Sequence, residues 1–332
     1  MDFKGLEDKF IGTLLGTAIG DTLGVPFEGQ IREQIIRYFD DFDEFIDKNH
    51  NIFRTYSDDT QLTIHTAKAI IRAGGIEEEI LIDEFIKWLN DPPIGAGFGC
   101  LSSIRKLAEG IPWKSAASNS GGNGTAMRIS PIGLFYSNNI EQLKKVASLN
   151  SNITHSHPAA EAGARVVASS IAFLLYKDPN KGFSINEFFQ TIINVISDKK
   201  DRIWEEFIEI LNDLQNNLDM DLIDGLKKYA QVGVKPPFYI KSLENKCFVH
   251  PYTISTVVCA LFIFLKNLDS FKKCIYILPT AGGDTDTCGA IGGSIAGSYF
   301  GFKNIPEKLI ALVQNSKEII QLGKELYQVS LR

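Results

Sequence analysis

The chain has 332 residues, a formal net charge of −6, 44% hydrophobic residues and 22% charged residues. This composition is typical of a folded soluble protein with a sizeable core, and the negative charge excludes a nucleic-acid-binding surface spread over the whole molecule. An anionic ligand would have to be met locally, by metal ions, backbone N–H groups or a few basic side chains.

Apolar residues recur at helical spacing along most of the chain, whereas alternating strand patterns are rare. Gly74-Gly75 and Pro92-Pro93 end two of the predicted helices, and the best strand candidate is the short segment 247–249. We therefore predict an all-α fold in one compact domain spanning 1–332. The predicted helices are 2–23, 62–73, 77–90, 126–136, 140–149, 159–176, 185–196, 202–214, 222–229, 254–268, 287–300 and 306–327.

Two of these helices carry a glycine at every fourth position. The first has Gly12, Gly16 and Gly20, with Gly24 just past its end, and the other set is Gly289, Gly293, Gly297 and Gly301. Each glycine inside a helix costs up to ~1 kcal/mol relative to alanine. Close approach of helix backbones would offset this cost, so we expect both to be central packing helices.

The cysteines and the first residues of the chain indicate the cellular compartment in which we expect the protein. The five cysteines are odd in number, lie far apart and form no Cys-x-x-Cys pair, which argues against a zinc knuckle or a disulfide framework. The first ten residues have no basic n-region, and the longest uncharged apolar stretches, Thr253–Leu265 and 287–302, are short for a bilayer. We expect a cytoplasmic monomer with reduced thiols, no membrane partner and no general nucleic-acid binding.

Two short acidic clusters precede apolar helices, Ser57-Asp58-Asp59-Thr60 and Asp284-Thr285-Asp286-Thr287. Each can be explained as a helix cap whose acids complement the helix dipole. If the two clusters meet in space, however, their four carboxylates repel one another unless a cation lies between them. Neither cluster contains Cys or His, so the ligand chemistry favours Mg²⁺ or Mn²⁺ over zinc.

Four blocks of sequence carry a resemblance to a known family. They are residues 12–28 (GTLLGTAIGDTLGVPFE), 57–60 (SDDT), 122–128 (GNGTAMR) and 282–287 (GGDTDT). In these blocks and their order, from about residue 10 to 300, the chain resembles the ADP-ribosylglycohydrolases. This family includes the dinitrogenase-reductase-activating glycohydrolase and the eukaryotic ADP-ribosyl-acceptor hydrolases.

The resemblance implies an all-α fold, a binuclear Mg²⁺ or Mn²⁺ centre and hydrolysis of an ADP-ribose conjugate by an activated water. The substrate would be an ADP-ribosylated protein or a small ADP-ribose conjugate, held by its distal ribose at the metals, with attack at the anomeric carbon. Family members often have Thr at the position of Ser57, which keeps the hydroxyl. The implied metal ligands are Ser57, Asp58, Asp59, Asp284, Asp286 and Thr287, and the implied catalytic residues are Glu28 and Asp59.

Two further acids lie in the first block. Glu28 matches an acid that sits on a mobile loop near the metals in part of the family, so it would be a general base or a ligand that moves when substrate arrives. The alternative for Glu28 is a surface residue in a polar turn. Asp21 lies in an apolar segment, where an unpaired carboxylate is costly. We expect it near the metals and the substrate, or as the buried partner of a backbone group.

The segment 119–124 is rich in glycine and would place backbone N–H groups around an anion such as a pyrophosphate. An ordinary glycine-rich turn is the alternative. Some relatives have an aromatic residue near Gly121 that stacks on adenine; here Phe98, Phe135 or Tyr136 would have to replace it. The expected substrate-binding residues of this loop are Ser120, Gly121, Gly122, Asn123 and Gly124.

Other polar residues admit a structural and a functional interpretation. His157 could approach the distal ribose or cap a helix together with His155, and Arg128 could contact a phosphate or an ion-pair partner. We interpret Asp91 as a turn residue before Pro92-Pro93, or as a residue on the acceptor side. His65 is expected to be a packed helical histidine, and Cys288 a small buried residue that is not a nucleophile.

Three other classes of protein compete with a hydrolase. One is a protein that binds ADP-ribose without cleaving it, and another is a metal-dependent enzyme acting on a different diphosphate-containing ligand. The adjacent Asp58-Asp59 pair fits the Asp-x-x-x-Asp spacing of helical prenyl-diphosphate enzymes poorly. The third is a purely structural helical protein, which four ordered motifs make the weakest alternative. The sequence does not identify the acceptor, which the loops on the acceptor side decide.

Overall fold

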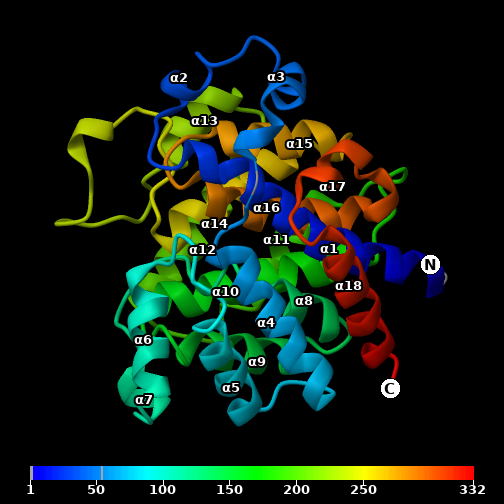
Figure 1. The fold of residues 1–332 in the computed structure, drawn as a ribbon. Helices are drawn as coiled ribbons and strands as arrows, with labels where there is room; N and C mark the ends of the chain where they lie inside the picture. Colours follow the sequence, from blue (N-terminus) through cyan, green and yellow to red (C-terminus); the bar gives the residue numbers. More distant parts are fainter. Residues whose placement is uncertain (1–2, 54) are drawn as a thin grey trace.

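The computed structural model describes residues 3–53 and 55–332, and within these residues it contains eighteen α-helices and no strand (Figure 1). The predicted all-α fold is therefore confirmed. The helices are α1 (Phe3–Gly24), α2 (Arg32–Ile35), α3 (Phe42–Asn49), α4 (Asp58–Ala73), α5 (Glu78–Trp88), α6 (Phe98–Ala108), α7 (Trp113–Ala116), α8 (Ser130–Phe135), α9 (Ile140–Asn152), α10 (Pro158–Leu175), α11 (Ile185–Asn194), α12 (Arg202–Asn216), α13 (Leu222–Tyr229), α14 (Thr253–Leu265), α15 (Phe271–Ile277), α16 (Thr285–Phe300), α17 (Glu307–Leu312) and α18 (Ser316–Ser330).

The two glycine-rich helices, α1 and α16, pack directly against each other at the centre of the molecule (Figure 1). A Cβ atom on Gly16 would lie 2.1 Å from the carbonyl oxygen of Gly293, and one on Gly20 would lie 1.9 Å from that of Gly289. The predicted close approach is therefore confirmed, and the glycines are required by it. The pairing is antiparallel, so the C-terminal end of α1 meets the N-terminal end of α16.

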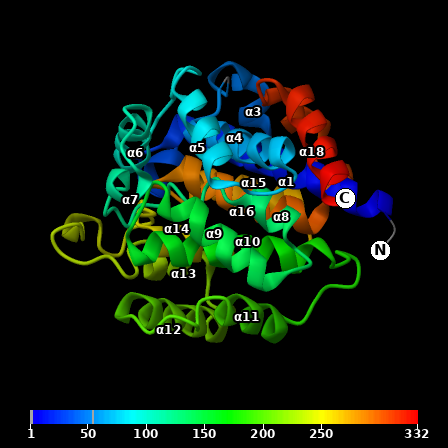
Figure 2. The ribbon, with the colours of Figure 1, turned by 90° about the horizontal axis from the view of Figure 1, so that it is seen from below.

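Other helices surround this central pair. Every residue of α14 and of α16 is buried, and α10 is buried along most of its length. Figure 2 shows α11 and α12 as an outer pair beyond α10 and α14. On the other side, α4 and α18 cover α1, and α5 packs on α4.

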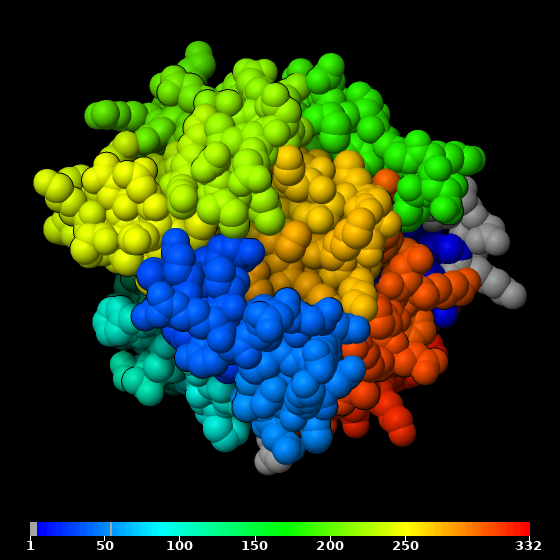
Figure 3. Space-filling view, turned by 90° about the horizontal axis from the view of Figure 1, so that it is seen from above, coloured from blue at the N-terminus to red at the C-terminus, as the bar shows by residue number. Residues whose placement is uncertain are grey.

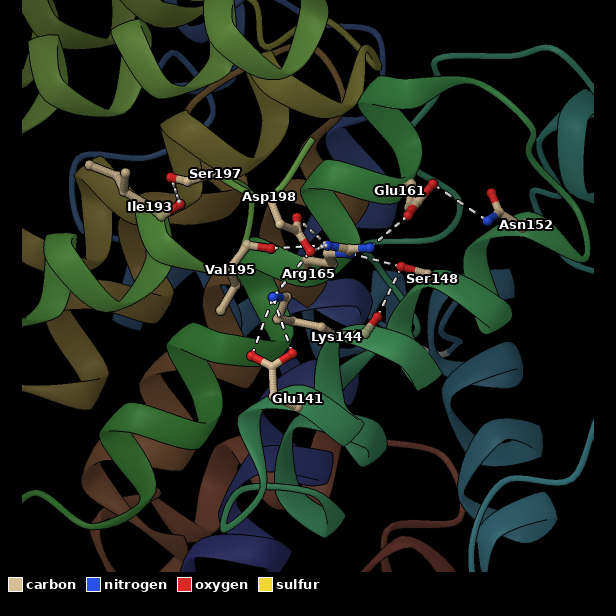
Figure 4. Close-up of polar contacts among 10 residues, drawn as sticks. All are labelled: Glu141, Lys144, Ser148, Asn152, Glu161, Arg165, Ile193, Val195, Ser197 and Asp198. Carbon is tan, nitrogen blue, oxygen red and sulfur yellow. Dashed lines mark hydrogen bonds and ion pairs between the residues drawn. The ribbon is translucent and has the colours of Figure 1, made fainter. Parts of the chain in front are cut away.

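A polar network joins α9 and α10 to the turn after α11 (Figure 4). Arg165 of α10 donates to Asp198 at 2.9 Å, to Ser148 at 2.8 Å and to Glu161 at 3.0 Å. Its guanidinium also lies 5.1 Å from the ring centroid of Trp204 in α12. This largely buried cation therefore fixes the outer helix pair to the core and leaves no donor directed at a ligand.

The structure corrects several predicted boundaries. The helix expected at 126–136 begins only at Ser130, because residues 124–128 form turns. The helix expected at 306–327 is two helices, α17 and α18, which are separated near Asn315 with its positive φ of 55°. The best strand candidate, 247–249, forms only an isolated bridge between Val249 and Gly283. Helices α2, α3, α6, α7 and α15 were not predicted.

Two segments, Gly5–Phe27 and Pro158–Leu175, are long and apolar enough to cross a membrane by length and composition alone. In this fold, the most apolar part of each segment is largely buried inside the protein, to 89% in the first segment and 83% in the second. Core helices of folded proteins pass the same test. Both segments contain charged residues, so neither is an uncharged apolar stretch.

Candidate active site

A cavity of ≈ 860 Å³ opens where the N-terminal ends of α4 and α16 meet. Its walls also include the residues after α1, the loop between α5 and α6, the glycine-rich loop before α8, and the segment 233–252. The predicted site residues that line it are Glu28, Asp58, Asp59, Ser120, Gly121, Gly122, Asn123, Gly124, His157, Asp284, Asp286 and Thr287. Asp21 and Ser57 lie behind this wall.

The first turn of α4 is capped twice. The Ser57 hydroxyl accepts a hydrogen bond from the N–H of Asp59 at 3.2 Å, as an N-cap residue does. The buried carboxylate of Asp21 accepts from the N–H of Ser57 at 2.9 Å and from the N–H and hydroxyl of Thr60 at 3.0 and 2.6 Å. The caps satisfy the first amides of α4, so Asp58 and Asp59 are not needed for capping and face the cavity. Both expectations for Asp21, a backbone partner and a neighbour of the site, describe its position.

The second acidic cluster begins α16 and touches the first. The hydroxyl of Thr287 donates to Oδ2 of Asp59 at 3.4 Å. Oδ2 of Asp284 accepts from the side-chain amide of Asn123 at 2.6 Å, and the N–H of Asp284 donates to the carbonyl of Val249 at 2.9 Å. The two clusters, far apart in sequence, therefore meet at one wall of the cavity. Asn123 was expected to contact substrate, but its side chain is bonded to Asp284 and to Thr256.

Burial and mutual repulsion raise the pKa of several acids at this wall. Burial, followed by the charge of Asp21, raises the pKa of Asp58 to about 7 and that of Asp59 well above its usual value. Burial and the charge of Asp284 raise the pKa of Asp286 in the same direction. Burial also raises the pKa of Asp21 to about 6, although its hydrogen bonds act against this. The metal-free site thus resists full ionisation at neutral pH.

These shifts predict how the stability of the metal-free protein depends on pH. A carboxyl with a raised folded-state pKa binds more protons in the native than in the unfolded state, so stability falls as pH rises from about 4 to about 7. With EDTA present, we expect the unfolding temperature to fall across this window by on the order of 5 °C. Mn²⁺ should recover most of the loss at pH 8, because a cation offsets the repulsion. A rise in stability across this window in EDTA would contradict the assignment.

The donors at this wall can be tested for their fit to a metal ion. They are all oxygen atoms, and Oδ1 of Asp59 is buried without a hydrogen-bond partner. Both features, with the excess negative charge, fit a hard divalent cation. Among residues 3–53 and 55–332, however, no group of three or more His, Cys, Asp or Glu side chains is arranged to hold a metal ion. The chemistry of the donors therefore fits a hard cation, although their arrangement in the described residues is not that of a preformed metal cluster.

Glu28 lies beside the second cluster. It follows a short 3-10 helix, Val25–Phe27, and lines the cavity. Partial burial and the charge of Asp284 raise its pKa. A carboxylate with a raised pKa close to other acids is suited to accept a proton near neutral pH. Glu28 is an exposed residue in a turn at the cavity wall, so its position is compatible with both alternatives, a surface residue in a turn and a group of the site.

The glycine-rich loop uses some of its own polar groups. The N–H of Gly122 donates to the hydroxyl of Ser120 at 3.1 Å, and that of Asn123 donates to the carbonyl of Pro251 at 3.2 Å. Of the five expected positions, only Ser120, Gly121 and Gly124 could direct an amide at an anion. The loop is held from behind by Thr253, whose hydroxyl donates to the carbonyls of Gly121 and Gly122 at 2.8 and 2.7 Å.

Tyr252 is a cavity residue that the sequence did not reveal. A Cβ atom on Gly121 would lie 2.7 Å from Cε2 of Tyr252 and 3.1 Å from the ring of His157. The two rings meet edge to face at 6.3 Å. Both rings therefore occupy the space beside Gly121. Of the aromatic residues predicted to be there, Phe98 lines the cavity, whereas Phe135 and Tyr136 do not.

The two histidines of the THSHP sequence both line the cavity but differ in environment. His157 caps α10 by accepting from the N–H of Ala159 at 3.2 Å, as expected, and burial lowers its pKa. Burial and the nearby cation of Arg128 lower the pKa of His155 to about 3, so this imidazole is neutral at physiological pH. Nδ1 of His155 is hydrogen-bonded to Thr154 at 2.9 Å.

Three other candidate residues make contacts within the protein and have structural roles. Arg128 is neither a phosphate contact nor an ion-pair partner: it is fully buried outside the cavity wall and donates to Asn150 and Thr154. His65 is buried between Glu84 and Asp91, each at 3.2 Å, which fixes Asp91 in the turn after α5. Cys288, like the other four cysteines, is buried, and burial raises the pKa of its thiol, as expected for a packed residue.

The fold and this site define an all-α protein built around an acid-lined cavity between two central helices and their neighbours. A model of the ADP-ribosylglycohydrolase family matches residues 3–332, and the chain belongs to this family. It is thus an enzyme of the ADP-ribosyl glycohydrolase class.

Relatives and one solved structure agree with the family over nearly the full length. The chain is 26% identical to the ADP-ribosylhydrolase ARH3 of Xenopus tropicalis, covering 98% of this chain and 96% of that protein. It is 22% identical to the ADP-ribosyl-[dinitrogen reductase] glycohydrolase of Rhodospirillum rubrum, covering 92% and 90%. A solved structure described as an ADP-ribosylglycohydrolase-related protein complex shares the fold, with a TM-score of 0.70, 21% identity and coverage of 98% and 99%.

Proposed function

We propose that this enzyme is a metal-dependent hydrolase that releases ADP-ribose from a modified protein side chain or a small conjugate. One observation carries the proposal: the acids Asp58, Asp59, Asp284 and Asp286 share a cavity wall with Glu28, and a glycine-rich loop forms part of the same cavity. The acids suit a cation and a ribose diol, and the loop suits a diphosphate. The family relationship supports the ADP-ribosyl part of the substrate.

The residues that would hold two Mg²⁺ or Mn²⁺ ions are Ser57, Asp58, Asp59, Asp284, Asp286 and Thr287. When bound, the ions supply Lewis acidity that lowers the pKa of a water molecule and an anchor for vicinal hydroxyls. Asp21 and Asn123 serve this set indirectly, because Asp21 fixes the first turn of α4 and Asn123 orients the carboxylate of Asp284.

In the proposed reaction, the oxygen of water forms a bond to the anomeric carbon of the distal ribose, and the bond from that carbon to the acceptor atom breaks. Glu28 takes a proton from the attacking water and passes it on to the departing acceptor atom, so that Glu28 ends the reaction as a carboxylate. The amides of Ser120, Gly121 and Gly124 hold the diphosphate. Tyr252, with its ring against Gly121, takes the place of the aromatic residue that the loop lacks and forms a platform for adenine.

Replacing Glu28 tests the proton-transfer step. We expect Glu28→Gln to lower kcat for ADP-ribose release by roughly 100-fold or more, because loss of a general base costs this much, while Mn²⁺ still binds. Glu79→Gln on the exposed side of α5 is a matched control and should leave kcat unchanged. Rates would be measured by chromatography of released ADP-ribose. Unchanged turnover in Glu28→Gln with metal bound would remove Glu28 from the mechanism.

A further inference from the structure

The segment that carries Glu28 is paired to the loop that carries Asp284. The N–H of Gly29 donates to the carbonyl of Gly283 at 2.9 Å, and the N–H of Gly283 donates back to the carbonyl of Gln30 at 2.7 Å. Two reciprocal backbone hydrogen bonds thus flank Glu28 on its C-terminal side. Such bonds resist a movement of the segment away from the site.

Arg32 adds a second connection between the same two loops. Its N–H donates to the carbonyl of Cys247 at 3.1 Å, and Nη1 donates to the carbonyl and the hydroxyl of Thr280 at 2.7 and 2.5 Å. Thr280 ends the short helix Leu278–Thr280, which leads into Gly282-Gly283-Asp284. Arg32 does not line the cavity, so its guanidinium acts on the protein and not on a ligand.

The glycines at this junction permit the close approach. Gly282 and Gly283 have positive φ values of 82° and 76°. A Cβ atom on Gly282 would lie 2.6 Å from the backbone nitrogen of Arg32 and 2.3 Å from the carbonyl oxygen of Cys247. Three chain segments therefore meet at backbone contact. In Figure 3 the blue surface of the segment around residues 30–50 abuts the yellow and orange surface of the later segments.

The other end of the Glu28 segment is anchored by aromatic packing. Phe27 is buried, and its ring lies 6.2–6.4 Å from five other rings, those of Tyr38, Phe39, Phe42, Phe45 and Phe53. The tether at Phe27 and the tether at Arg32 enclose Glu28 between them. The backbone on both sides of Glu28 is thus held in place, and its exposed side chain reaches the cavity from this tethered segment.

We infer that Glu28 is a preassembled base on a fixed loop, and that Arg32 is the positioning residue that locks this loop to the loop bearing Asp284. The inference rests on the proposed role of Glu28. It chooses between the two possibilities that the sequence left open, a fixed base and an acid that moves when substrate arrives. Holding a base in its reactive geometry before substrate binds avoids the cost of ordering it during the reaction.

The test compares Arg32→Met, which keeps the side-chain length without the donors, with Arg32→Lys and with Arg37→Met. Arg37 is exposed beside α2, and its replacement should leave kcat unchanged. We expect Arg32→Met to lower kcat about 10- to 100-fold, the usual effect of losing a residue that orients a reacting group, with KM and Mn²⁺ affinity within about threefold. Arg32→Lys, which can still donate to Thr280, should recover part of kcat.

A double mutant separates positioning of Glu28 from general damage to the fold. In a Glu28→Gln background, Arg32→Met should cause little further loss of kcat, because the group that it positions is already absent. If Arg32→Met lowered kcat by the same factor in both backgrounds, the inference would be overturned. A wild-type kcat in Arg32→Met would also overturn it.

Hydrogen exchange tests the fixed loop without any turnover. The amides of Gly29 and Gly283 should exchange slowly in the free protein, change by less than about threefold with Mn²⁺ and ADP-ribose, and exchange at least tenfold faster in Arg32→Met. Fast exchange in the free protein, with protection only when ligand is bound, would show a mobile loop and overturn the inference. If no conjugate is hydrolysed, the proposed function fails, and this measurement still decides whether the loop is fixed.

Discussion

Asp59→Asn is expected to lower the rate of ADP-ribose release by about 1000-fold and to stabilise the metal-free protein. The loss of rate follows because the Asp59 carboxylate is buried where the two clusters meet, and metal assistance contributes several kcal/mol, with each 1.36 kcal/mol equal to a factor of ten. The gain in stability follows because burial, followed by the charges of Asp21 and Asp58, raises the pKa of Asp59. At pH 8 asparagine removes the cost of ionising this buried carboxyl or of keeping a proton on it.

The two effects of Asp59→Asn would be measured by product release with Mn²⁺ and by thermal unfolding in EDTA at pH 8. Asp83→Asn is the matched control, since Asp83 lies on α5 in exposed ion pairs with Arg72 and Lys87 and outside the cavity. It should change neither the rate nor the unfolding temperature in this way. Retained turnover, or a metal-free Asp59→Asn protein less stable than the wild type, would contradict the role of Asp59 in a cation site.

Gly20→Ala is expected to destabilise the protein by about 3 kcal/mol or more, because overpacking a rigid contact forces backbone movement. The new Cβ atom would lie 1.9 Å from the carbonyl oxygen of Gly289, a backbone atom that cannot turn away. Helices α1 and α16 would have to separate at the end where Asp21 and Asp286 lie. Activity should therefore fall along with stability.

Thermal and denaturant unfolding of Gly20→Ala would measure the effect, with a drop in unfolding temperature on the order of 10 °C. Gly97→Ala is the control, because a Cβ atom there meets no heavy atom within 4 Å and φ is an ordinary −62°. Its stability should change by less than about 0.5 kcal/mol. A Gly20→Ala protein as stable as the wild type would show that the α1–α16 contact is looser than the structure indicates.

The long helices could be predicted from the sequence because their apolar periodicity extends over several turns. Helix α6 (Phe98–Ala108) was missed although Cys100, Ser103, Ile104 and Leu107 are buried at helical spacing. It follows Pro92-Pro93 and contains Gly99 and two serines, which made the segment read as a loop. The short α3 has a capped N-terminus at Asp41, but only Phe42 and Ile46 are buried in it, too few to reveal a period.

The acidic clusters could be predicted as one site through the order of the four motifs and the resemblance that they carry, because their spacing in the sequence does not show that they meet. What the sequence could not show are partners supplied from distant segments. The hydrogen bond from Asn123 to Asp284 joins residues that are 161 positions apart in the sequence. Tyr252, whose ring lies against Gly121, also comes from a distant segment of the sequence. Likewise, nothing in its motif shows that Arg128 is fully buried, with its guanidinium in contact with Asn150 and Thr154.

The most direct test of a metal-dependent ADP-ribosyl hydrolase is to incubate the purified chain with conjugates of ADP-ribose linked to arginine, serine and acetyl groups. Each conjugate would be tested in EDTA, Mg²⁺ and Mn²⁺, and free ADP-ribose would be quantified. We predict release from at least one conjugate with a divalent cation and its loss in EDTA. Release from none of them with metal bound, or equal release in EDTA, would contradict the account.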